Sequence, residues 1–101
     1  TAEAFALVKR LDNPGLAVNL DLSTMLAQGE SLQSFVDDLK YVSHVHISEP
    51  GLAPIQKRPE HKELALLLGA VGYQGYVSVE MGSTDLETIR RTLDYIAEVF
   101  A

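Results

Sequence analysis

Three residues of types that bind metal ions and transfer protons occupy matching places in this sequence: Asp21, His46 and Glu80. Each lies near the end of a short segment in which apolar and polar residues alternate, which is the pattern of a β-strand with one apolar face. The three positions are about 25 and about 34 residues apart, close to the length of a strand-helix unit. Because all three fall on the polar faces of their strands, we expect their side chains to converge.

Two carboxylates and one imidazole that converge would form a binding site for a divalent metal ion. Neighbouring strands lie ~4.8 Å apart, so three such side chains can reach one ion. Mixed oxygen and nitrogen ligands suit Mn²⁺, Co²⁺, Fe²⁺ or Zn²⁺. Mg²⁺ is a further candidate, and the sequence does not choose between these ions. Each residue alone could be structural, since a strand-end Asp often caps the next helix. Their common position on three strands favours the metal site.

Four further polar residues are candidates for substrate binding. His44 shares the polar face of its strand with the predicted metal ligand, although a packed interior histidine is the alternative. Glu49 ends the same segment. Lys57 and Arg58 lie in the following loop and could neutralise a phosphate or carboxylate group of a substrate, although charged loop residues are more often simply solvated.

The periodicity of apolar residues predicts four helices and three strands in strict alternation. Helices are expected at 2–11, 31–40, 59–71 and from the capping-box sequence 84–87 onward, and strands at 16–23, within 42–50 and at 76–81. A loop that could include a short helical turn is expected at 24–30, and a long loop begins at 49, at the end of the central segment, and runs to 58. The helix stripes expected to be buried include Leu7, Leu11, Leu86 and Leu93, whereas His61 is expected to be exposed. This alternation implies a parallel sheet with right-handed crossovers.

The strands predict an α/β fold that forms part of a (β/α)₈ TIM barrel, with about three parallel strands and four helices. A sheet covered by helices on both faces has continuously apolar strands, whereas these strands each keep a polar face that could line a barrel interior. Active sites of such barrels lie at the C-terminal ends of the strands. A complete barrel needs at least ~200 residues. Residues 1–101 are therefore predicted to be one domain, the C-terminal part of a larger enzyme, whose open sheet edges favour self-association.

Composition narrows the class of protein. The formal net charge of −6 and the absence of a basic stripe argue against a nucleic-acid-binding surface. There is no cysteine, so neither disulfides nor thiolate chemistry are available. No apolar segment approaches the ~20 residues needed to span a bilayer, so no membrane partner is expected. A cytoplasmic location is the expectation that follows.

Two motifs resemble a known family. The sequence His-Val-His-Ile-Ser-Glu-Pro at 44–50 and the sequence Gly-Tyr-Gln-Gly-Tyr-Val-Ser-Val-Glu-Met at 72–81 resemble the C-terminal part of sugar phosphate isomerases/epimerases, in the xylose isomerase-like superfamily. Asn-Leu-Asp at 19–21 resembles the preceding strand of that family. The resemblance implies four metal ligands from four successive strands, of which Asp21, His46 and Glu80 match the last three. It also implies that Glu80 is a catalytic carboxylate that transfers a proton next to a metal-polarised carbonyl.

Three functions remain open at this stage. The first is a divalent-metal-dependent sugar or sugar-phosphate isomerase/epimerase, of which residues 1–101 alone would be inactive because one ligand is missing. The second is an enzyme with the same barrel and metal site that catalyses a different reaction. That reaction would be dehydration, as in inosose dehydratases, or phosphodiester hydrolysis, as in endonuclease IV-like enzymes. The third is a non-catalytic α/β module whose polar strand faces serve assembly. The acidic net charge argues mildly against a DNA substrate.

Overall fold

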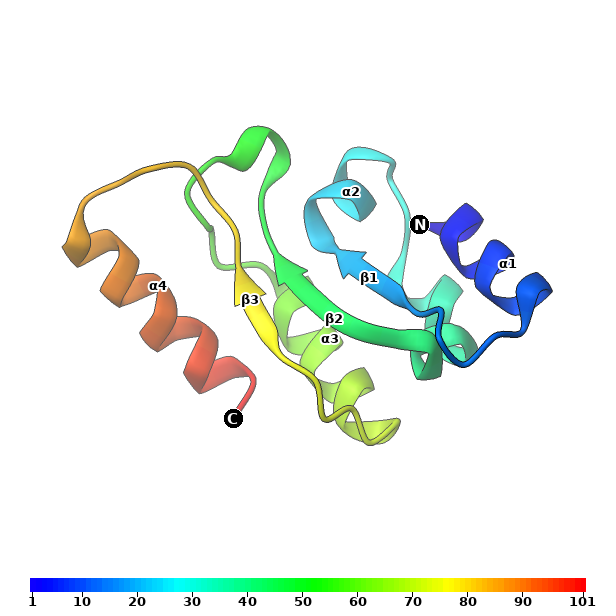
Figure 1. The fold of residues 1–101 in the computed structure, drawn as a ribbon. Helices are drawn as coiled ribbons and strands as arrows, with labels where there is room; N and C mark the ends of the chain where they lie inside the picture. Colours follow the sequence, from blue (N-terminus) through cyan, green and yellow to red (C-terminus); the bar gives the residue numbers. More distant parts are fainter.

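A computed structural model describes residues Thr1 to Ala101. Four α-helices, three β-strands and two 3₁₀-helices follow one another along the chain (Figure 1). In order they are α1 (Ala2–Leu11), β1 (Val18–Asp21), α2 (Leu22–Ala27), η1 (Leu32–Tyr41), β2 (Val42–Ile47), η2 (Pro50–Leu52), α3 (Pro59–Ala70), β3 (Val77–Val79) and α4 (Leu86–Val99). No helix is both long and apolar enough to cross a membrane.

The strands form one open, parallel sheet in the order β1-β2-β3. Leu20 pairs with Val45, and Val45 pairs with Val77, so the central strand β2 has a partner on each side. The register of β1 against β2 shifts once, between Val18 and Asn19, which leaves Ser43 as an extra residue in β2. The predicted α/β fold with three parallel strands is confirmed, and the four predicted helices correspond to α1, the 3₁₀-helix η1, α3 and α4.

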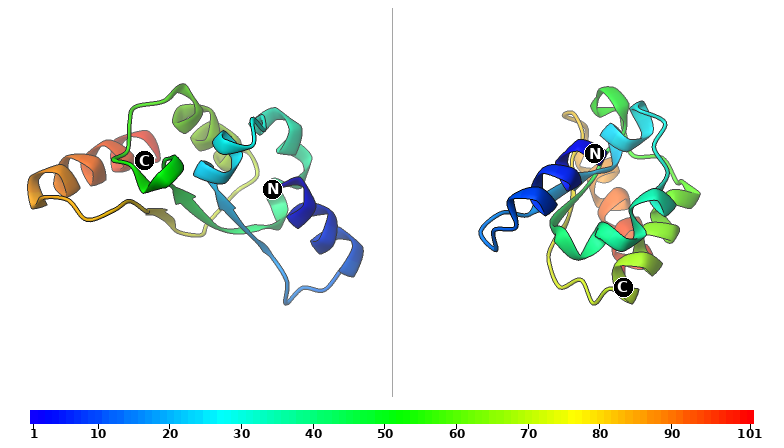
Figure 2. Two further views of the ribbon diagram at one scale, coloured as in Figure 1. Left: turned by 90° about the horizontal axis from the view of Figure 1, so that it is seen from above. Right: turned by 90° about the vertical axis from the view of Figure 1, so that its right-hand side faces the viewer.

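The apolar face of the sheet is buried against helices. Figures 1 and 2 show η1, α3 and α4 on one side of the strands. Leu20, Val45 and Ile47 are fully buried there, in one cluster with Leu39 of η1 and Leu64 of α3. Burying such a side chain contributes about 1.5–3 kcal/mol. The predicted alternation therefore holds for β1 and β2, and it leaves the polar residues between these positions on the opposite face.

The segment after β1 forms the six-residue helix α2, where the sequence predicts the end of a strand and a loop with a short helical turn. β1 ends at Asp21 and α2 begins at once, two residues before the predicted end of the strand. The side chain of Asp21 accepts a hydrogen bond from the backbone N–H of Thr24, which satisfies one of the free donors of the first helical turn. The capping residue of α4 also differs from the prediction, because Asp85 rather than Thr84 accepts from Thr88 N.

Several helix faces are exposed where burial was predicted. Leu7 and Leu11 of α1 are 47% and 51% exposed, and Leu86 and Leu93 of α4 are 80% and 52% exposed. The physical reason is position, because α4 lies outside the edge strand β3 and has neighbours on one side only (Figure 1). His61 differs in the opposite sense. It is fully buried in α3, where its Nδ1 lies 2.7 Å from the hydroxyl of Tyr95 of α4.

Candidate metal centre

The structure brings Asp21, His46 and Glu80 together at the C-terminal ends of the three strands. One ligand atom from each residue lies within 4.8 Å of the other two. His46 Nδ1 is 3.0 Å from Glu80 Oε2 and 4.0 Å from Asp21 Oδ2. The side chains of Asp21, His46 and Glu80 are 29%, 28% and 46% exposed, so solvent and a ligand can reach all three.

Strand pairing explains this convergence. Asp21 and His46 are direct partners in the register of β1 and β2. Glu80 immediately follows β3, and its backbone N–H donates to the carbonyl of Ile47 at 2.9 Å, which continues the pairing by one residue. Side chains alternate between the two faces of a strand, so these residues lie opposite the buried Leu20 and Ile47.

Hydrogen bonds orient the carboxylate of Asp21. Its Oδ1 accepts from Ser23 Oγ at 2.6 Å, from Ser48 Oγ at 2.9 Å and from Thr24 N at 3.1 Å. Partial burial raises the pKa of Asp21, but these hydrogen bonds and the nearby imidazole of His46 outweigh burial, and the pKa lies below its ordinary value. Asp21 is therefore ionised at neutral pH, which is the form that binds a cation.

The donor set fits a divalent cation. Two carboxylate oxygens and one imidazole nitrogen face one another, and no cationic side chain of Lys or Arg is paired with Asp21 or Glu80. A neutral His46 has a lone pair on one ring nitrogen, and Nδ1 is the nitrogen that faces both carboxylates. Which of these three ligands a metal would use, and which metal it would be, stays a prediction.

His44 lies beside this cluster. Its ring packs edge-on against the ring of His46 with 4.8 Å between centroids, and its Nε2 lies 2.9 Å from Ser78 Oγ. His44 is thus held on the polar face of the sheet, next to the three predicted ligands. Its substrate-binding role stays a prediction.

The other predicted substrate-binding residues have partners of their own. Glu49 is 2% exposed and its carboxylate accepts from Arg58 Nε at 2.8 and 2.9 Å and from Gln56 N at 3.3 Å. Hydrogen bonds from Arg58 are the main reason that the pKa of Glu49 is lowered. Lys57 places its amino group 5.5 Å from the centre of the Tyr95 ring. The structure therefore pairs Glu49 with Arg58 in the loop before α3 and does not include them in the group formed by Asp21, His46 and Glu80.

Sequence reasoning missed Ser23 and Ser48, which hold Asp21. Ser48 is fully buried, and its position two residues after His46 continued the polar alternation of the strand. That signal could have identified it. Ser23 lies in the first turn of α2, two residues after Asp21, and nothing in the sequence marked its hydroxyl as a partner of that carboxylate.

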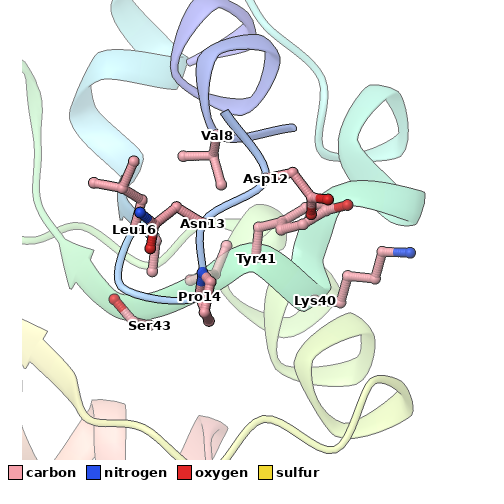
Figure 3. A pocket seen from close by; sticks show the side chains of 10 residues that line it. Val8, Asp12, Asn13, Pro14, Leu16, Lys40, Tyr41 and Ser43 are labelled. Atoms are coloured by element: carbon pink, nitrogen blue, oxygen red, sulfur yellow. The ribbon is translucent and has the colours of Figure 1, made fainter. Parts of the chain in front are cut away.

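A separate cavity lies at the opposite end of β1 and β2 (Figure 3). It has a volume of about 370 Å³ and is lined partly by Val8, Leu16 and Tyr41. The amino group of Lys40 points away from the other labelled side chains, and Asn13 Oδ1 accepts from Gly15 N at 2.8 Å. Asp12 is the only Asp, Glu or His side chain in its lining, so this cavity holds no group comparable to Asp21, His46 and Glu80.

No family model and no curated protein matches the chain. One solved structure is similar: the crystal structure of the apo form of 3-keto-D-glucoside 4-epimerase, YcjR, from E. coli. The TM-score is 0.78 and the sequence identity 24%, over 96% of this chain and 39% of that chain. This chain thus spans well under half the length of that epimerase. At this identity the likeness establishes a shared fold.

These comparisons correct the family predicted from the motifs. The assignment to sugar phosphate isomerases/epimerases of the xylose isomerase-like superfamily is wrong, because no family model matches and the similar structure is a 3-keto-D-glucoside 4-epimerase. The motifs failed because His-x-His and Ser-Val-Glu are short, and the polar face of any strand in such a fold can carry similar residues. The similar structure is nevertheless that of a sugar epimerase.

Proposed function

We propose that this chain forms part of the divalent-metal centre of a sugar epimerase or isomerase that acts on a keto sugar. The observation that carries the proposal is the convergence of Asp21, His46 and Glu80 at the C-terminal ends of three parallel strands. The similarity to a 3-keto-D-glucoside 4-epimerase supports a carbohydrate with a carbonyl group as the substrate class.

The surroundings of Asp21, His46 and His44 suggest a different role for each residue. Asp21 is ionised and oriented by three hydrogen bonds, and His46 presents Nδ1 to both carboxylates, so these two residues would hold the cation. When bound, a divalent cation supplies a Lewis acid that polarises a carbonyl group. His44, next to His46, would contact hydroxyl groups of the sugar.

Glu80 is the proposed base. It is the most exposed of the three residues, and one of its oxygens lies 3.0 Å from His46 Nδ1. In epimerisation the C–H bond next to the carbonyl would break and its proton would pass to the Glu80 carboxylate. A second acid on the opposite face of the carbon, which Asp21, His46 and Glu80 do not supply, would donate the proton that forms the new C–H bond. A positioned carboxylate contributes ~10²–10⁴-fold to such a transfer.

We further propose that the chain is one part of a larger barrel enzyme. Support comes from the polar face of the sheet, the helices on its other face, and the longer chain of the similar epimerase. β1 and β3 each have one unpaired edge, which upstream and downstream strands of a barrel would pair. Taken alone, these edges and the exposed apolar residues near β3 favour association between copies of the chain.

Metal binding tests the proposal. We expect Mn²⁺, titrated calorimetrically into the chain, to bind at one site, and Asp21→Ala to abolish the binding. Asp37→Ala is a matched control, since Asp37 is an exposed aspartate of η1 away from the cluster. A folded chain that binds no Mn²⁺, or one whose binding survives in Asp21→Ala, contradicts the proposal. If Mn²⁺ binds as expected, an enzyme that carries this chain would next be screened for epimerisation of 3-keto-glucosides. Dehydration and phosphodiester hydrolysis are the competing reactions in that screen.

A further inference from the structure

Ser48 joins the end of β2 to the segment that follows β1. The residue is fully buried, one position beyond the last residue of β2. Its hydroxyl donates to Asp21 Oδ1 at 2.9 Å and accepts from the backbone N–H of Ser23 at 3.1 Å. Both partners of this one hydroxyl therefore lie at the start of α2, and one of them is a proposed metal ligand.

These bonds leave the two oxygens of Asp21 in different situations. Oδ1 accepts from three donors, Ser23 Oγ, Ser48 Oγ and Thr24 N, which more than fills its two lone pairs. Oδ2 takes none of these bonds and lies 4.0 Å from His46 Nδ1. The carboxylate cannot turn about its terminal bond without giving up the three bonds to Oδ1. Its orientation thus keeps Oδ2 directed at the metal cluster.

Capping of α2 does not by itself account for Ser48. An aspartate at the N-cap needs the backbone N–H of the third residue on, and Thr24 supplies it. Ser48 comes from a different strand, and it is buried without contact to solvent. Placing a hydroxyl there costs desolvation that only its hydrogen bonds offset. Those bonds lead to Asp21 and to the turn that carries Asp21.

We propose that Ser48 is a positioning residue for the metal centre, whose hydroxyl fixes the Asp21 carboxylate so that Oδ2 faces the ion. The inference rests on the proposed function. Groups that orient metal ligands in this way typically change metal affinity ~10–100-fold when removed. Ser23, whose Oγ donates to the same oxygen, is expected to act in the same direction.

The experiment compares the Mn²⁺ affinity of the wild-type chain with that of Ser48→Ala, Ser48→Thr and Ser23→Ala by calorimetric titration. We expect Ser48→Ala to bind Mn²⁺ about 10–100-fold more weakly. Ser48→Thr keeps the hydroxyl and should recover most of the affinity. Ser23 is half-buried, so Ser23→Ala removes another hydrogen bond to Asp21 Oδ1 without creating a cavity in the core. Its Mn²⁺ affinity tests the same effect if Ser48→Ala does not fold.

A second measurement needs no metal. The amide of Ser23 loses its acceptor in Ser48→Ala, so its hydrogen exchange should accelerate relative to wild type. Faster exchange together with weaker Mn²⁺ binding supports the inference. Wild-type Mn²⁺ affinity in folded Ser48→Ala, even with a lower melting temperature, assigns Ser48 a purely structural role and overturns the inference while the metal site stands. A wild-type chain that binds no Mn²⁺ overturns the proposed function, and the inference with it.

Discussion

His46 Nδ1 lies 3.0 Å from Glu80 Oε2, although β2 and β3 are separated in the chain by a loop and a whole helix. His46 lies in β2 and Glu80 immediately follows the adjacent parallel strand β3, and the backbone N–H of Glu80 donates to the carbonyl of Ile47, the residue after His46. The contact is thus a product of strand register. It places the proposed base and the imidazole proposed to bind the metal side by side at the C-terminal end of the sheet.

Substitution of Glu80 tests its proposed role as the catalytic base. In a complete enzyme that carries this chain, Glu80→Gln is expected to lower turnover ~10²–10⁴-fold, because the amide cannot accept the proton. Steady-state kinetics on the accepted keto sugar measures the loss. Glu87→Gln, at an exposed glutamate of α4, is the control that should keep wild-type turnover. Unchanged turnover in Glu80→Gln would remove Glu80 from the mechanism.

Breaking the ion pair between the buried Glu49 and the partly exposed Arg58 should destabilise the chain. Arg58→Ala leaves Glu49, 2% exposed, without its main partner, and the expected loss in the free energy of unfolding is about 3 kcal/mol. Urea unfolding measures it. Arg10→Ala, at an exposed arginine of α1, should change stability very little.

The same pair has a pH signature. The pKa of Glu49 is lowered from 4.5, chiefly by the hydrogen bonds from Arg58, so its contribution to stability is complete above 4.5. That contribution is lost as the pH falls through the native pKa. Arg58→Ala should therefore weaken the acid dependence of unfolding. An acid dependence identical to wild type would show that the pair does not control it.

His61 predicts a second pH dependence, at higher pH. Burial is the main cause that lowers the pKa of His61 from 6.5, with the nearby Arg58 acting in the same direction and Glu49 and Glu60 opposing it. The unfolded chain therefore takes up a proton first. Stability is complete above 6.5, falls as the pH drops below 6.5, and levels off below the native pKa.

Unfolding of wild type and His61→Gln by urea at a series of pH values tests this. The variant has no titrating group at this position, so its stability should change less across the window below 6.5. Lys62→Gln, at the exposed neighbouring residue, should keep the wild-type profile. A wild-type profile in His61→Gln would assign the pH dependence to other groups.

The exposed apolar residues next to β3 predict association. Tyr76 and Leu86 are each 80% exposed, and a cavity of about 370 Å³ lies between the end of β3 and α4. The isolated chain is expected to show a concentration-dependent mass in light scattering, and Leu86→Glu should lower it. Leu66→Glu, at an exposed leucine of α3, adds the same negative charge away from β3 and should leave the mass unchanged. A monomeric mass throughout the micromolar range would contradict the expectation.

Local periodicity was enough to predict three strands and to place Asp21, His46 and Glu80 near their ends, with the alternation of buried and polar residues confirmed in β1 and β2. That was possible because side chains alternate between the two faces of a strand, so the face of Asp21, His46 and Glu80 follows from their own neighbours in the chain. Parallel pairing then brings equivalent strand ends together. The convergence of the three side chains needed no information beyond this local periodicity and the order of helices and strands.

The hydrogen-bond partners and the burial of these residues could not be read from local periodicity, because they depend on contacts between elements far apart in the chain. The bond from Ser48 to Asp21 joins residues 27 positions apart and depends on register and side-chain rotamers together. Burial of His61 against Tyr95, and exposure of Leu86 and Leu93, depend on which helices have neighbours. An apolar stripe predicts that a helix face can be buried, but only the packing of other elements against it decides whether it is.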